Sequence, residues 1–421
     1  GSVSLVDCNN FYVSCERLFN PRLEKRPVIV LSNNDGCVVS RSEEAKALGI
    51  AMGVPFFQIK NFCFNHSVEV FSSNYSLYGD ISSRVMKILV DMVSDVEIYS
   101  IDEAFLQYPA SMNSDEILEH CRDIRRKILQ WVGIPTSLGI ATTKTLAKLG
   151  SKLAKKDRLV GVFDVREAQV QEAILDKFPI GDVWGIGRRW EEKLRASGIR
   201  TAKEFRDKDL IYIRKKMGVN GERIWWELRG KSCIPLEERA SKKSITCSRS
   251  FGQAVRGKEA LLEAISTYVA SACVKLREQD SCASALCVYV EMVWDAKTGK
   301  QNGYSMAASF ATPTSNTSEV IADAKRCIHQ LYREDCIYKK CGVVLLELSS
   351  DSEEKMDLFM EREDPKRKEL TKTIDALNKK WGKDTVFYGA MGLTKSSWKM
   401  RSESRSFCYT TKWEELPVVK G

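Results

Sequence analysis

The sequence predicts an α+β protein of several domains. Strand-like apolar runs recur at 3–7, 28–31, 96–106 and 137–140, with segments of helical spacing between them. The chain has 421 residues, more than the ~250–300 residues that one hydrophobic core usually serves. The apolar fraction of 43% is typical of a folded globular protein.

The composition narrows the classes of function. Lys and Arg number 65 against 56 Asp and Glu, and the formal net charge of +9 favours a polyanionic partner. The 14 cysteines include no C-x-x-C pair, and with three histidines a zinc module is not expected. We expect reduced, mostly buried thiols in a cytosolic protein. No apolar run of 18 residues appears, so we expect no membrane partner.

Three carboxylates stand where strand-like runs end or are interrupted. Asp7 ends the first run, and the pair Asp102-Glu103 interrupts the run 96–106. Buried carboxylates are costly unless a cation neutralises them, and hard oxygen ligands suit Mg²⁺. Two such ions can hold the attacking and leaving oxygens of a nucleotidyl transfer. Adjacent side chains on a flat strand point to opposite faces, so this pair can share metals only at a bend or hairpin tip.

Two helices are predicted near candidate binding residues. The stretch 40–43 reads S-R-S-E, the pattern of a capping box, and predicts a short helix over 42–48. A second helix is predicted over 142–156, where lysines recur every four residues. These lysines are Lys144, Lys148, Lys152 and Lys156. Like charges at this spacing repel each other, so the stripe either contacts a partner anion or forms a solvated face.

The second half of the chain has a glycine turn and a domain boundary. The run 183–187 reads V-W-G-I-G and precedes a segment with helical spacing. Such a turn is typical of a helix-hairpin-helix module, whose backbone N–H groups hold a DNA phosphate. An ordinary helical hairpin is the alternative. The charged linker 237–244 predicts a boundary, and strands are predicted at 285–293 and 342–348.

Motifs from residue 3 to about 410 together resemble the Y-family translesion DNA polymerases, and in particular their UmuC-like branch. The stretches that carry the resemblance are 7–16, 26–30, 31–37, 44–49, 72–75, 99–105, 144–148 and 184–189. The resemblance implies a right-hand polymerase. Its parts would be a palm (3–10 and 73–165), fingers (11–72), a helical thumb (166–237), a little finger (243–349) and a C-terminal tail (350–421).

The resemblance also implies roles for single residues. Asp7, Asp102 and Glu103 would be the catalytic carboxylates and bind two Mg²⁺ ions, with the Cys8 carbonyl as a backbone ligand. Tyr12 would be the steric gate, whose ring clashes with a ribose 2′-OH; the alternative is a core aromatic. The implied substrate-binding set is Phe11, Tyr12, Ser40, Arg41, Lys46 and Lys155.

One departure concerns the triphosphate. Lys46 and Lys155 fall where family members place basic residues on the phosphates. Many members have Tyr at position 43 and Arg at position 46, whereas this chain has Glu43 and Lys46. The bidentate fork of an arginine is therefore absent at position 46.

Partners follow from the same resemblance. Gly185, Gly187 and Arg188 would contact primer-template DNA. The stretch 355–359, K-M-D-L-F, resembles a sliding-clamp-binding peptide, with Leu358 and Phe359 entering an apolar pocket of the clamp. Alternatively, these two side chains tie the tail to the protein. A processed UmuD-like dimer and RecA are further implied partners. The resemblance also implies a protein of the bacterial cytoplasm that is associated with the nucleoid.

We therefore expect an error-prone DNA polymerase that extends a primer with dNTPs across damaged bases in the SOS response. Fingers of about 60 residues are short for a closing element, which suggests an open site with weak geometric checking. A nucleotide cyclase also has a palm with paired carboxylates, but the long C-terminal half argues against it. A catalytically silent DNA-binding scaffold is the other alternative, and the intact carboxylate set argues against that.

Overall fold

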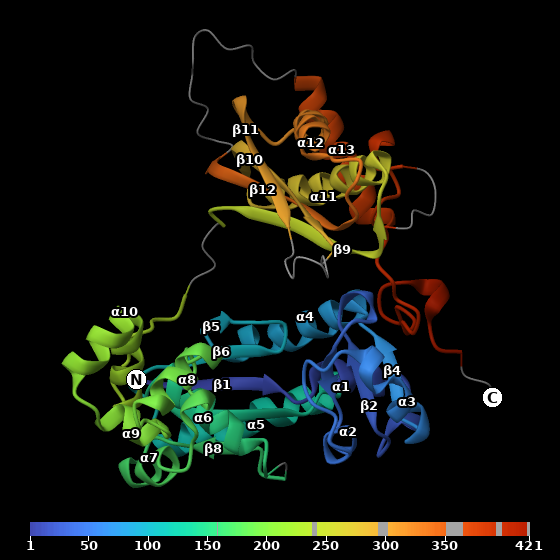
Figure 1. Ribbon diagram of the computed structural model, residues 1–421. Helices are drawn as coiled ribbons and strands as arrows, with labels where there is room; N and C mark the ends of the chain where they lie inside the picture. The colour runs from blue at the N-terminus through green and yellow to red at the C-terminus, as the bar shows by residue number, and fades with distance from the viewer. Residues whose placement is uncertain (158, 238–241, 294–301, 351–364, 393–397, 419–421) are drawn as a thin grey trace. The chain divides into compact units, whose positions relative to one another are not determined.

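The computed structural model describes residues 1–157, 159–237, 242–293, 302–350, 365–392 and 398–418. The chain divides into two compact units (Figure 1). The first comprises Gly1–Ser32, Gly36–Arg239 and Ser404–Gly421; the second comprises Asn33–Asp35 and Ala240–Glu403. Each unit combines helices with a β-sheet, so the predicted α+β class with several domains is confirmed.

A five-stranded sheet in the order β5-β6-β1-β7-β8 forms the centre of the first unit. Its strands are β1 (Ser2–Cys8), β5 (Asp95–Ile98), β6 (Glu103–Tyr108), β7 (Thr136–Ala141) and β8 (Val162–Asp164). The strand-like run predicted over 96–106 forms two strands, β5 and β6, with a turn between them. The backbone N–H groups of Tyr99 and Ser100 both bond to the Glu103 carbonyl and close a hairpin between β5 and β6.

Helices cover both faces of this sheet. They are α4 (Tyr75–Met92) and α5 (Ser114–Val132) on one face and α6 (Lys144–Ala154) on the other. Side chains alternate along β1, so that Val6 packs with α4 and α5 while Leu5 packs with α6. The predicted helix over 142–156 is confirmed, with Thr143 as its N-cap.

A smaller three-stranded sheet, in the order β3-β2-β4, lies in the same unit. The elements around it are α1 (Phe11–Phe19), η1 (Pro21–Leu23), β2 (Val28–Leu31), β3 (Val38–Arg41), α2 (Glu43–Ala47), α3 (Phe56–Asn65) and β4 (Glu69–Ser72). The capping pattern predicted over 40–43 is shifted. Ser42 caps α2 by accepting a hydrogen bond from the Ala45 N–H, whereas Ser40 lies on β3.

Short helices follow β8 and share a core with α6. They are α7 (Ala168–Leu175), η3 (Ile180–Asp182), α8 (Arg188–Ala196), α9 (Ala202–Asp207) and α10 (Leu210–Leu228). Leu194 of α8, Phe205 of α9 and Leu149 of α6 are among the buried side chains of this core. The packing fixes the glycine turn before α8 relative to the central sheet.

The second unit contains a four-stranded antiparallel sheet in the order β11-β10-β12-β9. Its elements are η2 (Asn33–Asp35), β9 (Ile245–Val255), α11 (Lys258–Glu278), β10 (Ser281–Met292), β11 (Gly303–Thr314), α12 (Thr317–Leu331), β12 (Tyr338–Ser350), α13 (Pro365–Trp381) and η4 (Gly389–Met391). The runs predicted at 285–293 and 342–348 correspond to β10 and β12. β11 was missed because its side chains are mostly exposed or half-buried and small.

The segment expected to be a C-terminal tail contains ordered structure. Arg277 of α11 pairs with Asp375 of α13 at 2.6 Å inside the second unit. Residues after Ser404, including η5 (Trp413–Glu415), belong to the first unit. Leu358 and Phe359 lie outside the described residues. None of the helices in the described ranges is long and apolar enough to span a bilayer.

Candidate active site

The ends of β1 and β6 bring acidic residues together. Asp7 and Glu103 are directly opposite each other in the antiparallel register. Opposed Cβ atoms of this kind lie about 5 Å apart, so the two carboxylates occupy one site on the α6 face. Asp102 precedes β6 in the hairpin turn, and its carbonyl accepts a hydrogen bond from the Cys8 N–H at 2.9 Å. The turn satisfies the geometric condition for two adjacent acids to share a site.

Lysines from the end and middle of α6 contact two of these carboxylates. Lys155 Nζ lies 2.6 Å from Asp7 Oδ2, and Lys148 Nζ lies 3.0 Å from Glu103 Oε2. Lys148 had no role in the sequence-based prediction beyond the lysine stripe. Lys155 was expected to bind a triphosphate, and in this structure it binds a carboxylate instead.

The acidic cluster carries more negative charge than its lysines offset. Burial raises the pKa of Asp7 from 3.8 to about 7; Lys155 acts in the opposite direction, while Glu103 and Asp102 raise the pKa further. A carboxylate with such a pKa is ionised at neutral pH only at a cost. A cation bound among these groups would remove that cost.

The donor set fits Mg²⁺ in its chemistry, because carboxylate and carbonyl oxygens are the hard ligands that this ion prefers. Within the described ranges, however, no three His, Cys, Asp or Glu side chains are grouped as a ready-made metal site. The acidic side chains are engaged by Lys155, Lys148 and the Ser100 hydroxyl, which donates to Asp102 Oδ1 at 2.7 Å. Metal binding therefore requires these contacts to be exchanged.

The lysine stripe is divided: Lys144 and Lys148 are buried or half-buried, whereas Lys152 and Lys156 are exposed to solvent. Lys144 is buried and pairs with Glu97, and Lys152 Nζ lies 2.6 Å from Asp182 Oδ1. With Lys148 on Glu103, three of its four members have intramolecular carboxylate partners. The sequence spacing showed the stripe, but these partners are distant in sequence.

Tyr12 lies on α1 beside aromatic side chains of α4. Its ring stacks on that of Tyr78, with centroids 4.4 Å apart and planes at 15°. Tyr75 meets it edge-on at 6.2 Å. Tyr12 is half-buried, whereas Phe11 is only 3% exposed and belongs to the core. An exposed edge on a fixed ring suits a wall of a binding site.

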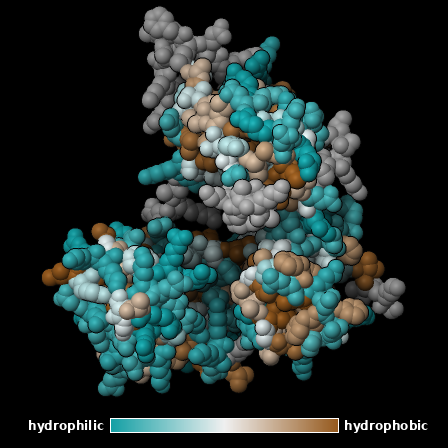
Figure 2. All heavy atoms as spheres, viewed as in Figure 1, coloured by the Kyte–Doolittle hydropathy of each residue, from teal (hydrophilic) through white to brown (hydrophobic). Residues whose placement is uncertain are grey.

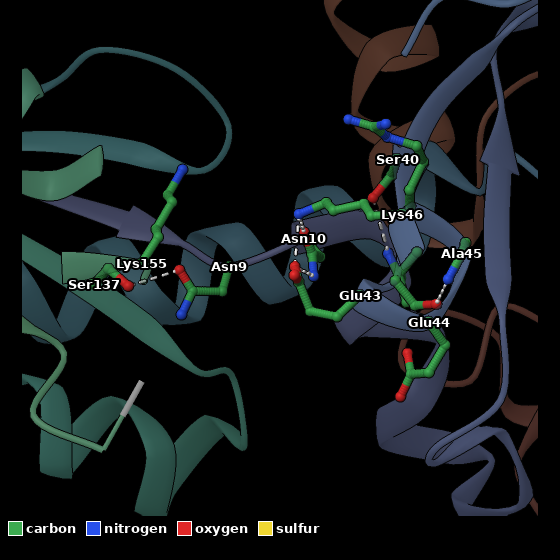
Figure 3. Close-up of polar contacts among 12 residues, drawn as sticks. Asn9, Asn10, Ser40, Glu43, Glu44, Ala45, Lys46, Ser137 and Lys155 are labelled. Atoms are coloured by element: carbon green, nitrogen blue, oxygen red, sulfur yellow. Dashed lines mark hydrogen bonds and ion pairs between the residues drawn. The ribbon is translucent and has the colours of Figure 1, made fainter. Parts of the chain in front are cut away.

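Lys46 is held by two neighbours (Figure 3). Its Nζ lies 2.6 Å from Glu43 Oε1 and 2.7 Å from Asn10 Oδ1. The acid at position 43, where many family members have Tyr, therefore partly neutralises the lysine that was expected to bind phosphate. The Asn10 contact places Lys46 close to the start of α1.

Ser40 and Arg41 make contacts within the fold. Ser40 Oγ accepts a hydrogen bond from the Val13 N–H at 3.4 Å. Arg41 Nη1 donates to the Ile50 carbonyl at 2.6 Å, while its buried Nε has no protein partner. The structure brings both near α1 and α2, and their contact with substrate stays a prediction.

The two glycines of the G-x-G turn differ in their surroundings. Gly185 has φ +92°, and a Cβ there would lie 2.8 Å from the Ile224 side chain. Gly187 is the N-cap of α8, and a Cβ there would meet nothing within 4 Å. Gly185 thus serves the turn itself, whereas Gly187 leaves open space at a helix N-terminus, where backbone N–H groups attract phosphate.

The surface around this turn is polar. Figure 2 shows a mostly hydrophilic face over the α7–α10 region. The Arg188 side chain is 91% exposed, although its Nε lies 3.3 Å from Glu192 Oε1. A surface of this kind can follow a phosphate backbone without burying apolar groups.

Comparisons with known proteins extend over nearly the whole chain. Models of the impB/mucB/samB family match residues 6–152, and those of its C-terminal domain match 242–358. A domain of unknown function, DUF4113, matches 368–419.

Relatives and solved structures agree with these matches. The chain is 40% identical to protein UmuC of Salmonella typhimurium, over 99% of this chain and 100% of the relative. It is 28% identical to DNA polymerase IV 1 of Bacillus subtilis, over 91% and 92%. A Y-family DNA polymerase chimera of known structure has a TM-score of 0.68 at 22% identity and covers 83% of this chain and 100% of its own. The chain therefore belongs to the impB/mucB/samB family and is a UmuC-like Y-family DNA polymerase.

Proposed function

We propose that the chain extends a primer on damaged template DNA by two-metal nucleotidyl transfer at Asp7, Asp102 and Glu103. The observation that supports this most is the direct opposition of Asp7 and Glu103, with Asp102 in the adjoining turn. Like charges directly opposite each other destabilise a sheet. A cation bound between the two carboxylates would remove this repulsion, which is why we propose that the pair binds cations.

The carboxylates and the Cys8 carbonyl would hold two Mg²⁺ ions. When bound, these ions lower the pKa of the primer 3′-OH and offset the charge on the transferred phosphate. Lys155 would then leave Asp7 and turn to the triphosphate. Its side chain is 42% exposed, against 10% for Asp7, so the lysine is the partner with room to move.

Other side chains would bind and select the substrates. Tyr12 would reject a ribose 2′-OH by contact with its ring, and Lys46 would add charge at the phosphates once released from Glu43. The backbone at Gly187 and the exposed Arg188 would hold a phosphate of the primer-template. Short fingers and weak geometric checking would allow damaged bases to be accepted.

Several partners and settings also remain proposals. Leu358 and Phe359 would bind a sliding clamp. A processed UmuD-like dimer, RecA, the SOS response and a place at the nucleoid follow from the family resemblance alone.

Primer extension with Mg²⁺ tests the proposal. Asp102→Asn keeps an acceptor for the Ser100 hydroxyl but removes the charge, and we expect extension to fall at least ~100-fold because metal ions supply several kcal/mol of stabilisation. Asp95→Asn, an exposed acid of the same hairpin, is the control and should keep full activity.

The same assay separates the alternatives. A silent scaffold would bind primer-template without extending it, and a cyclase would convert a nucleotide without a template. Wild-type extension by Asp102→Asn would overturn the metal assignment.

A further inference from the structure

A C-terminal segment packs onto the start of α4 in the first unit. The Ser72 N–H donates to the Ser404 carbonyl at 3.1 Å, and the Ser404 N–H donates to Ser72 Oγ at 3.0 Å. Asn74 Nδ2 then donates to the carbonyls of Ser406 and Phe407, each at 3.1 Å. These bonds join positions more than 300 residues apart in the sequence.

Asn74 also sets the beginning of α4. Its Oδ1 accepts the Leu77 N–H at 3.3 Å as the N-cap of that helix. Its side chain is almost fully buried, and Nδ2 donates to Ser406 Oγ at 3.0 Å as well. The motif 72–75, which contributed to the family resemblance without any assigned role, therefore docks the C-terminal segment.

Ser406 passes this contact to a buried carboxylate. Its Oγ donates to Glu16 Oε1 at 3.0 Å, and the Tyr78 hydroxyl donates to the same oxygen at 2.6 Å. Glu16 is 2% exposed, and its hydrogen-bond partners in the described part of the chain are these two hydroxyls. A buried carboxylate is costly when only neutral donors satisfy it, and losing one donor increases that cost.

The carboxylate is connected to the proposed sugar-selecting ring. Tyr12 and Glu16 are one turn apart on α1, so both face α4. Tyr78 is fully buried, stacks on Tyr12 at 4.4 Å and is anchored at its hydroxyl by Glu16. An aromatic ring rejects a ribose 2′-OH by steric clash only if the ring is held in place. A shift of the ring by less than ~1 Å would relieve the clash, and misplacements of about this size change reaction rates strongly.

We propose that Ser406 is a positioning residue for sugar selection, acting through Glu16 and Tyr78 on the ring of Tyr12. The inference rests on the proposed role of Tyr12 as the steric gate. It gives the C-terminal segment a part in choosing between dNTP and rNTP, although in the described part of the chain that segment makes no hydrogen bond to Asp7, Asp102 or Glu103.

Single-nucleotide insertion on the full-length protein tests the proposal. The readout is kcat/KM for an rNTP divided by kcat/KM for the matching dNTP, because this ratio does not change when only the folded fraction of enzyme falls. We expect Ser406→Ala to raise the ratio about fivefold, well within the ~100-fold effect of misplacing a reacting group by 1 Å.

Four further variants complete the design. Tyr78→Phe keeps the stacked ring and removes the hydroxyl, so it should raise the ratio in the same direction even if Ser406→Ala folds poorly. Ser406→Thr keeps a hydroxyl and should restore the wild-type ratio. Ser404→Ala is the matched control, since the exposed Ser404 docks through its backbone. Tyr12→Ala should raise the ratio most.

The outcomes are distinguishable. A wild-type ratio in both Ser406→Ala and Tyr78→Phe, with a raised ratio in Tyr12→Ala, overturns the inference and leaves the proposed function intact. Equal shifts in Ser404→Ala and Ser406→Ala also overturn it, because the segment would then act only as general support. An unchanged ratio in Tyr12→Ala removes the gate and the inference with it, while primer extension still tests the polymerase.

Discussion

The buried carboxylate of Glu16 should make the first unit less stable as the pH rises. Burial raises the pKa of Glu16 from 4.5 to about 7, although hydrogen bonds from Tyr78 and Ser406 act in the opposite direction. In the unfolded chain the group has its ordinary pKa. Between these values the folded protein therefore binds more protons than the unfolded chain, and the free energy of unfolding falls with increasing pH.

The size of the effect follows from the two pKa values. The stabilising contribution is complete below about pH 4.5 and is lost as the pH rises through about 7. Between about pH 5.5 and about pH 8, the difference amounts to about 2 kcal/mol at 1.36 kcal/mol per pH unit. Asp7 titrates in the same range, so the contribution of Glu16 must be isolated by a variant.

Glu16→Gln provides that comparison, because an amide stays neutral and keeps an oxygen for both hydroxyls. Urea unfolding at about pH 5.5 and about pH 8 should show the wild type losing about 2 kcal/mol more than the variant. Comparing the two pH values cancels any pH-independent cost of the amide. Parallel pH profiles for wild type and Glu16→Gln would refute the reasoning.

A second Glu→Gln variant serves as the control. The control residue is Glu44. Partial burial raises the pKa of its carboxyl group, but hydrogen bonds from its own backbone N–H and from Arg17 outweigh this effect and hold the pKa below its usual value. Stability from such a group is lost only as the pH falls below about 4.5. Glu44→Gln should therefore leave the difference between about pH 5.5 and about pH 8 unchanged.

Three further predictions concern substrates and partners. Tyr12→Ala should raise ribonucleotide insertion relative to deoxyribonucleotide insertion, and an unchanged ratio would make Tyr12 a packing residue. Gly187→Ala should weaken primer-template binding and lower the salt slope by about 1, with only the small loss of Tm that alanine causes at an N-cap. Gly185→Ala should reduce Tm more, through its positive φ and the contact with a neighbouring side chain. Leu358→Ala with Phe359→Ala should abolish stimulation by a sliding clamp on long templates and spare synthesis on short ones; equal clamp retention would contradict this.

Local sequence patterns predicted the elements of the fold well where a pattern is complete within one element. The helix over 142–156 and the strands β1, β2 and β7 follow from apolar spacing and turn residues. The strand boundary between β5 and β6 was not predicted, although two adjacent acids could share one site only at a bend. β11 was not predicted, because most of its residues are small or polar, although Met306, Ala308 and Phe310 alternate toward the core.

The site was predictable only in part, because its residues are paired across long distances in sequence. The acids were found from their chemistry, since carboxylates at strand ends are unusual. The lysines that contact them, Lys148 and Lys155, could be seen only as part of a periodic stripe or by family resemblance. Glu16 and Ser406 lie 390 positions apart, and no local pattern connects them.

The charge balance of the acidic site depends on how closely α6 approaches the central sheet. A Cβ at Gly139 would lie 2.1 Å from the Ser151 backbone nitrogen and 2.2 Å from the Ala147 carbonyl oxygen. Only glycine allows this approach, and the approach places Lys148 and Lys155 within 3.0 and 2.6 Å of their carboxylates. A larger residue at position 139 of β7 would displace α6 and, with it, both lysines. The acids would then lose their internal cations, so a glycine without any chemistry of its own controls how the site is neutralised before substrate binds.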